Sequence, residues 1–126
     1  MTEGGTRVLV ADDDADILAL VRLRLERGGY TVVTAVDGEQ ALRLAREGAF
    51  DLAVLDVSMP KLSGHEVTRE LRRDEATKGL PVILLTARVQ DADVADGLAA
   101  GADGYLKKPF GPKELLGEVQ ALLDRR

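Results

Sequence analysis

Short hydrophobic runs, each bounded by Gly, Asp or Pro, recur along the chain. They cover residues 7–11, 31–36, 51–55, 81–85 and 104–106. Their length and their content of β-branched and leucine residues predict five β-strands. The first, third and fourth runs contain uninterrupted apolar stretches, which is typical of strands covered on both faces. We therefore expect these three strands in the middle of one sheet.

Between the runs, apolar residues recur at the three- to four-residue spacing of amphipathic helices. The five sets are Ile17, Val21 and Leu25; Ala41, Leu42 and Ala45; Val67 and Leu71; Val94 and Leu98; and Leu115, Leu116, Val119, Leu122 and Leu123. Glycines at 28–29, 48 and 101 are expected to end the first, second and fourth helices. Strict alternation of strand and helix predicts an α/β fold, a doubly wound parallel sheet with helices on both faces.

The length and composition predict one folded unit. The 126 residues, of which 45% are hydrophobic, can supply one core. We see no internal repeat beyond the strand-helix unit, no low-complexity stretch and no linker. We expect a single domain over residues 1–126, with its core at about 7–123 and no output domain in this chain.

Charge and residue usage exclude several classes of function. The net charge of −5 and the pI of about 4.9 argue against direct binding of nucleic acid. The absence of cysteine excludes disulfides and thiol chemistry, and two Tyr, two Phe and no Trp make stacking of a flavin unfavourable. No apolar run approaches the roughly 20 residues needed to cross a bilayer. We expect a cytoplasmic protein that does not bind membranes.

Polar side chains stand where the predicted strands end. Asp12, Asp13 and Asp14 follow the first strand, Asp56 the third, Thr86 the fourth, and Lys107-Lys108-Pro109 the fifth. The carboxyl ends of parallel strands share one edge of the sheet, where ligands of such folds bind. Oxygen ligands without His or Cys favour Mg²⁺. The sequence therefore predicts a Mg²⁺ site at Asp12, Asp13 and Asp56.

A carboxylate beside a cation can also be a nucleophile toward a phosphoryl group, forming an acyl phosphate. Asp56 is the best placed candidate for this role. Phosphoryl transfer needs little beyond positioning and cancellation of charge, which Mg²⁺, a Lys ammonium and a Thr hydroxyl supply. The residues alone do not choose between Lys107 and Lys108.

These motifs, in this order, resemble the response-regulator receiver domain of two-component signalling, which is CheY-like. The resemblance spans residues 7–123 and rests on Asp12-Asp13, on the segments 56–60 (DVSMP) and 85–87 (LTA), and on GADGYLKKPF at 101–110. It implies a flavodoxin-like sheet in the order 2-1-3-4-5, flanked by five helices. It also implies a phosphoacceptor, not an enzyme, that assists its own phosphorylation and dephosphorylation.

The resemblance implies a role for each site residue. Asp56 would be phosphorylated, and Mg²⁺ would be held by Asp12, Asp13, Asp56 and the backbone carbonyl of Ser58. Thr86 and Lys108 would bind the phosphoryl group, the Lys108–Pro109 bond would be cis, and Tyr105 would swing inward with Thr86. The chain departs from common family patterns at Ser58 and Ser63, and the positions of Ser58 and Arg88 affect how long the phosphoryl group survives.

The resemblance further implies partners. A histidine kinase or phosphotransfer protein would donate the phosphoryl group, in a phosphorelay or directly. An unknown protein target would bind the face formed by the fourth helix, fifth strand and fifth helix. The domain would act as a monomer or as a phosphorylation-dependent homodimer.

Other interpretations remain open at this point. The chain could be the receiver part of a longer DNA-binding transcription regulator. A Mg²⁺-dependent aspartyl-phosphate hydrolase would need an acid two residues after the nucleophile, where Ser58 stands. Among single residues, Asp14 and Asp16 are expected to stabilise a helix N-terminus, Lys107 and His65 to lie on the surface, and Tyr105 to be either plain packing or a switch.

Overall fold

The computed structural model describes residues 5–87 and 99–125. The elements in chain order are β1 (Arg7–Ala11), α1 (Ala15–Arg27), β2 (Thr31–Ala35), α2 (Gly38–Glu47), β3 (Leu52–Asp56), α3 (Gly64–Arg73), β4 (Val82–Thr86), β5 (Gly104–Lys107) and α5 (Pro112–Asp124). All strand pairs are parallel, and the sheet order β2-β1-β3-β4-β5 confirms the predicted one. The helix expected around Val94 and Leu98 lies outside the described residues, as does Arg88.

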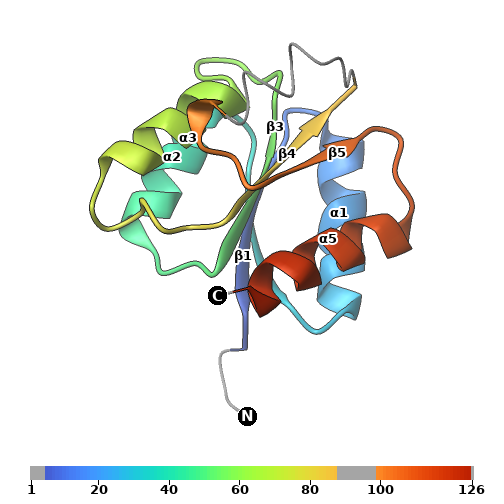
Figure 1. The fold of residues 1–126 in the computed structure, drawn as a ribbon. Coiled ribbons are helices and arrows are strands. Elements are labelled where there is room, and N and C mark those ends of the chain that lie inside the picture. Colours follow the sequence, from blue (N-terminus) through green and yellow to red (C-terminus); the bar gives the residue numbers. More distant parts are fainter. Residues whose placement is uncertain (1–4, 88–98, 126) are drawn as a thin grey trace.

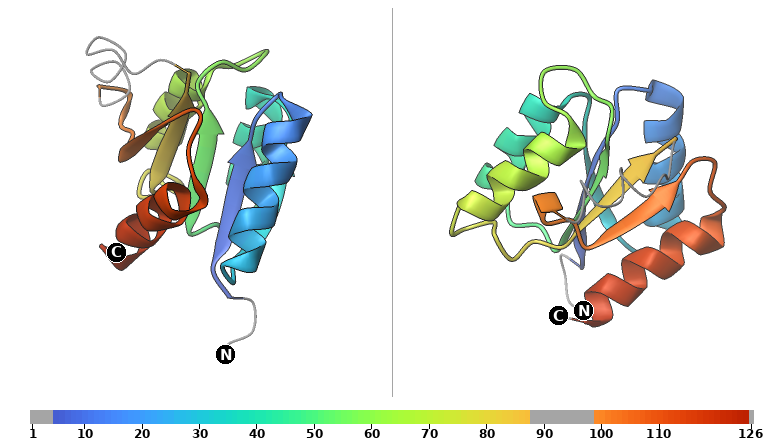
Figure 2. Two further views of the ribbon diagram at one scale, coloured as in Figure 1. Left: turned by 90° about the vertical axis from the view of Figure 1, so that its right-hand side faces the viewer. Right: turned by 45° about the horizontal axis from the view of Figure 1, so that its top comes forward.

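Helices cover both faces of the sheet, so the domain has three layers (Figures 1 and 2). Helices α1 and α5 pack on one face, and α2 and α3 on the other. Because successive strand residues point to opposite faces, Val8 and Val10 contact the first pair of helices while Leu9 and Ala11 contact the second. Strands β3 and β4 are buried throughout. The expectation that β1, β3 and β4 lie in the middle is confirmed.

The helix ends follow local hydrogen-bonding chemistry. The Asp14 side chain caps α1 by accepting from the backbone N–H groups of Asp16 and Ile17, as expected for a carboxylate at a helix N-terminus. Gly28 and Gly48 end α1 and α2, as predicted. No helix in the described ranges has the length and hydropathy to cross a membrane.

Strands β3 and β4 each begin and end one residue later than the hydrophobic runs indicated. Asp56 still pairs with Leu85, and Thr86 still pairs with Lys107, so both polar residues are the last members of their strands. A polar residue can be the last residue of a strand, because strand pairing depends on backbone hydrogen bonds and not on the side chain. The carboxyl edge of the sheet is therefore where the polar residues gather.

Candidate functional site

Three carboxylates meet at the carboxyl edge of the sheet. Asp12 and Asp13 follow β1 and Asp56 ends β3; one oxygen from each lies within 4.8 Å of the others. The pairing of Ala11 with Leu55 on adjacent strands brings Asp12 next to Asp56. Asp12 is 1% exposed and Asp56 5% exposed, whereas Asp13 lies at the surface. Two of the three carboxylates are therefore buried, and the third, Asp13, faces solvent.

Lys108 supplies the positive charge beside these acids. Its Nζ lies 3.0 Å from Asp12 Oδ2 and 3.0 Å from Asp56 Oδ1, and it donates a hydrogen bond to each. Lys107 is exposed and pairs through its backbone with Thr86. Of the two lysines, Lys108 is therefore the one whose side chain reaches the carboxylates. The Lys108–Pro109 peptide bond is cis, as the resemblance implies.

Burial and mutual charge change the acidity of this pair. Burial raises the pKa of Asp56 above its ordinary value, the hydrogen bond from Lys108 opposes this, and the negative charge of Asp12 adds to it. Burial alone would lower the pKa of Lys108, but its hydrogen bonds to Asp12 and Asp56 outweigh burial and raise it. Asp56 is therefore easier to protonate than an ordinary aspartate, chiefly because it is buried.

Thr86 and Ser58 flank the carboxylates. Thr86 is 7% exposed and lies one residue beyond Leu85, the strand partner of Asp56. Its carbonyl oxygen accepts a hydrogen bond from the Lys108 N–H at 2.8 Å, so Thr86 and Lys108 are fixed to each other. Ser58 is exposed, in the turn after β3. Its carbonyl as a metal ligand stays a prediction.

Two glycines let neighbouring segments approach the loop after Asp56. A Cβ on Gly64 would lie 2.5 Å from the Asp56 carbonyl oxygen, and a Cβ on Gly38 would lie 1.9 Å from the Leu62 carbonyl oxygen. Both distances are below any normal contact, so the backbone packs here only because the side chains are absent. The sequence analysis missed Gly38; its place after Asp37, an Asp-Gly pair behind a strand, was the available signal.

Tyr105 and His65 meet on the side of the sheet that carries α3. Tyr105 is half-buried on β5, and its hydroxyl lies 2.9 Å from Nε2 of His65 in the first turn of α3. His65 is only partly exposed, and its ring is hydrogen-bonded, a contact that the expected surface position did not include. Nothing in the sequence pattern indicated that His65 and Tyr105, 40 positions apart, are in contact.

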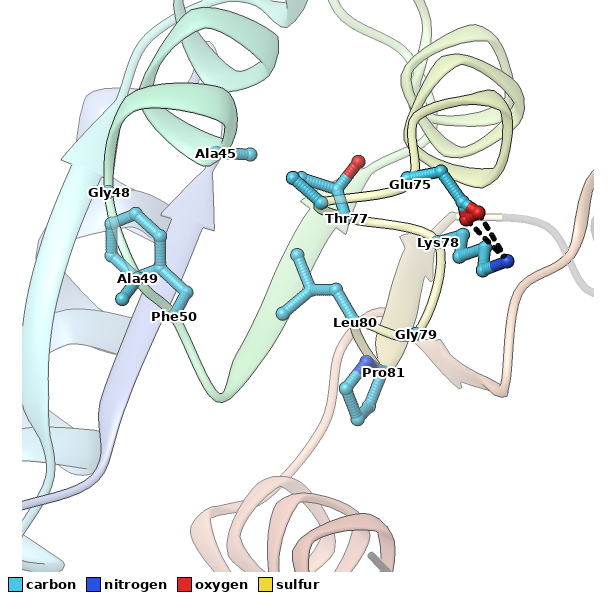
Figure 3. Close-up of a pocket in the computed structure, with 11 residues that line it drawn as sticks. Ala45, Gly48, Ala49, Phe50, Glu75, Thr77, Lys78, Gly79, Leu80 and Pro81 are labelled. Carbon is cyan, nitrogen blue, oxygen red and sulfur yellow. Dashed lines mark hydrogen bonds and ion pairs between the residues drawn. The ribbon is translucent and has the colours of Figure 1, made fainter.

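A separate cavity of about 470 Å³ lies at the opposite end of the strands (Figure 3). Phe50, Leu80 and Pro81 line it from the loops that precede β3 and β4, and the exposed Glu75–Lys78 ion pair stands at its side. Because these loops enter the strands, the cavity is far from the carboxyl edge. It shares no residue with the carboxylate group.

The carboxylate group suits a small, hard cation. Mg²⁺ commonly takes one or two carboxylates and keeps several waters, which the exposed position of Asp13 permits. The described site contains carboxylates, a hydroxyl and an ammonium, a set that stabilises negative charge on transferred phosphoryl oxygens. The geometry therefore fits phosphoryl chemistry at Asp56.

Known sequences resemble most of the chain. The response regulator receiver domain model matches residues 8–120. The alkaline phosphatase synthesis transcriptional regulatory protein PhoP of Bacillus subtilis is 45% identical over 119 residues, which cover 94% of this chain and 49% of PhoP. The transcriptional regulatory protein PrrA of Mycobacterium tuberculosis is 49% identical over 120 residues, covering 95% and 51%. The chain spans about half the length of these curated relatives.

Solved structures resemble the whole domain. The receiver domain of the sensor histidine kinase PA1611 of Pseudomonas aeruginosa, with a magnesium ion coordinated in its active site cleft, is 33% identical with a TM-score of 0.89, covering 95% of this chain and 98% of that one. The response regulator TrrA of Thermotoga maritima, in complex with Mg²⁺ and BeF, is 38% identical with a TM-score of 0.84, covering 93% and 98%. The chain belongs to the response regulator receiver domain family, the phosphoacceptor domains of two-component signalling.

Proposed function

We propose that this receiver accepts a phosphoryl group on Asp56 in a reaction that depends on Mg²⁺. The observation that carries the proposal is the contact of the buried Asp56 carboxylate with Lys108, within 4.8 Å of two further carboxylates. A carboxylate so surrounded is a nucleophile held in one place beside charges that can offset those of a phosphoryl group.

Each side chain has a role in this reaction. Asp12, Asp13, Asp56 and the Ser58 carbonyl would hold Mg²⁺, which when bound offsets charge on the phosphoryl oxygens. The Asp56 carboxylate attacks phosphorus as the bond from phosphorus to the donor nitrogen breaks, and the electron pair of that bond stays on the donor. Lys108, already 3.0 Å from Asp56 Oδ1, donates to a phosphoryl oxygen built on that carboxylate. Thr86 donates its hydroxyl from the neighbouring strand end.

The proposed partners follow from the family. A histidine kinase or a histidine phosphotransfer protein supplies the phosphoryl group, and a protein target reads the surface of β5 and α5. The part of that surface expected from a fourth helix lies outside the described residues. PhoP and PrrA are named as transcriptional regulators, and the chain aligns with about half of each. This favours an output in transcription, with Asp56 phosphorylation controlling a DNA-binding partner or domain.

The direct test is labelling by acetyl phosphate, followed by intact mass spectrometry, in wild type, Asp56→Asn and the matched control Asp16→Asn. Asp16 is an exposed acid in the first turn of α1, outside the carboxylate group. Wild type and Asp16→Asn should gain one phosphoryl mass that EDTA prevents, and Asp56→Asn should gain none. Undiminished labelling of Asp56→Asn would show that the acceptor is another residue.

The hydrolase alternative has no support at Ser58. An enzyme that turns over small phosphate esters needs an acid there to protonate the leaving group, and a serine hydroxyl is a poor acid. Release of many equivalents of inorganic phosphate per protein from simple esters would revive that alternative.

A further inference from the structure

The hydrogen bond between His65 and Tyr105 joins two distant parts of the chain. Nε2 of His65 lies 2.9 Å from the Tyr105 hydroxyl, and the rings meet edge to face with centroids 6.5 Å apart and planes at 65°. His65 is the only histidine in the sequence. Both rings are half-buried, so water competes only partly for the two polar atoms.

The His65 end of this contact is anchored on the phosphoacceptor segment. Its neighbour Gly64 donates its N–H to the Val57 carbonyl at 2.9 Å, and the Gly64 backbone approaches the Asp56 carbonyl so closely that a Cβ would not fit. The Thr68 hydroxyl closes this turn of α3 by donating to the Gly64 carbonyl at 2.7 Å. A displacement of the backbone at Asp56 or Val57 therefore reaches His65 without an intervening flexible side chain.

The Tyr105 end belongs to the strand that leads to Lys108. Tyr105 pairs with Leu84 in register, two residues before Thr86, and its ring packs on the hydrophobic cluster on the side of α2 and α3. Packing holds the Tyr105 ring on the side of the sheet that carries α2 and α3, and the Tyr105 hydroxyl adds a directional hydrogen bond with His65 of α3. The position of Tyr105 is thus set jointly by β5 and by the start of α3.

We propose that His65 is a positioning residue that holds the Tyr105 side chain beside α3 in the unphosphorylated domain, and that this hydrogen bond is lost when a phosphoryl group on Asp56 displaces the backbone to which α3 is anchored. This inference rests on the proposed function. When a domain has two states, a contact that is stronger in one of them changes the affinity of any ligand that prefers one state. The coupling is reciprocal: ligand binding weakens or strengthens the contact by the same factor.

The experiment is a double-mutant cycle with His65→Leu and Tyr105→Phe, read by NMR during titration with Mg²⁺ and beryllofluoride, a mimic of the acyl phosphate. Each single variant should lower the half-saturating beryllofluoride concentration by about threefold to tenfold, because it removes one hydrogen bond that only the unphosphorylated state makes. The double variant should show no further change. His65→Gln, which keeps a donor and an acceptor, should restore part of the wild-type value.

The possible outcomes separate this inference from the proposed function. A wild-type protein that shows no beryllofluoride-dependent shifts at Asp56 contradicts the proposed function itself. Wild-type binding with unchanged half-saturation in both single variants, even where their melting temperatures fall, means that the contact is merely structural and overturns the positioning role. Additive effects in the double variant overturn it as well, because the two residues then act separately.

Discussion

Replacing Asp56 by asparagine should stabilise the metal-free domain while abolishing its function. Asp56 is 5% exposed, and its pKa is raised by burial despite the hydrogen bond from Lys108. A raised pKa means that the folded protein binds the proton of this carboxyl more tightly than the unfolded chain does. The ionised carboxylate therefore costs stability near neutral pH, and a neutral amide of the same shape removes that cost.

The size of the effect follows from the distances. With an effective dielectric constant of about 20, the Lys108 ammonium at 3.0 Å attracts the Asp56 charge by about 5.5 kcal/mol. Asp12, whose oxygen lies within 4.8 Å, repels it by about 3.5 kcal/mol, and Asp13 repels it by less because it is exposed and screened by solvent. Lys108 therefore offsets the two acids, and the cost that remains is that of burial, the largest cause of the raised pKa, which is about 1 to 2 kcal/mol for a buried polar group. For a domain of this size, a gain of about 1 to 2 kcal/mol raises the melting temperature by about 4 to 8 °C.

The assay is thermal unfolding by circular dichroism in EDTA, for wild type and Asp56→Asn. The variant should melt higher near neutral pH, and the difference in melting temperature should narrow as the pH falls toward 3.8, the ordinary pKa of Asp, because the folded wild-type carboxyl takes up its proton in this range and becomes neutral. Added Mg²⁺ should raise the wild-type melting temperature more than that of the variant. A variant that melts at or below wild type in EDTA near neutral pH would refute the stability cost of the buried, ionised carboxylate.

Three further substitutions test how the site is held. Lys108→Met leaves Asp12 and Asp56 without their positively charged partner. In EDTA it should lower the free energy of unfolding, measured with urea, by about 2 to 3 kcal/mol. The control Lys107→Met, at an exposed position, should change that free energy by less than about 0.5 kcal/mol. Gly38→Ala places a Cβ 1.9 Å from the Leu62 carbonyl oxygen, so it should lower the free energy of unfolding by about 2 to 3 kcal/mol and weaken Mg²⁺ binding. The control Gly79→Ala adds a Cβ with nothing within 4 Å and should leave stability nearly unchanged. Equal effects of the two substitutions would contradict the close approach at Gly38. Arg72→Met removes hydrogen bonds to the Leu80 and Gly101 carbonyls and to Asp103, and should lower the free energy of unfolding by about 2 kcal/mol. The exposed Arg73→Met should change it little in the same urea titration. An unchanged urea midpoint for Arg72→Met would show that solvent replaces the lost hydrogen bonds.

Much of the fold could be predicted because strands and helices bury side chains with different periods. The uninterrupted apolar runs of β1, β3 and β4 required cover on both faces, and alternation with helices then left few possible topologies. The strand ends were displaced by one residue at Asp56 and Thr86, because hydrophobicity does not report the backbone pairing that extends a strand. The carboxylate group was predictable for a simpler reason: parallel strands end at one edge.

Contacts that depend on three-dimensional approach could not be predicted in this way. The Gly38 backbone touches the loop after Asp56 across 24 positions of sequence, and His65 meets Tyr105 across 40. Neither contact produces a periodic signal, and the Asp37-Gly38 pair indicates a turn without indicating that Leu62 lies against it. The choice of Lys108 over Lys107 also needed either the family resemblance or the structure, since two adjacent lysines at a strand end differ only in the direction of their side chains.

The stability cost of the buried Asp56 carboxylate and its role as a nucleophile are two aspects of one arrangement. A phosphoacceptor must be ionised to attack phosphorus, yet burial and the charge of Asp12 favour its protonated form, and Lys108 offsets them only in part. A cation held by Asp12, Asp13 and Asp56 would lower the cost of the ionised form and supply the charge that the phosphoryl oxygens need. The domain would then be least stable without its cation and most reactive with it. The Mg²⁺ dissociation constant fitted to the logarithmic rise of the melting temperature should therefore agree with the half-saturating Mg²⁺ concentration of labelling, and a large difference between the two would separate the stabilising site from the reacting one.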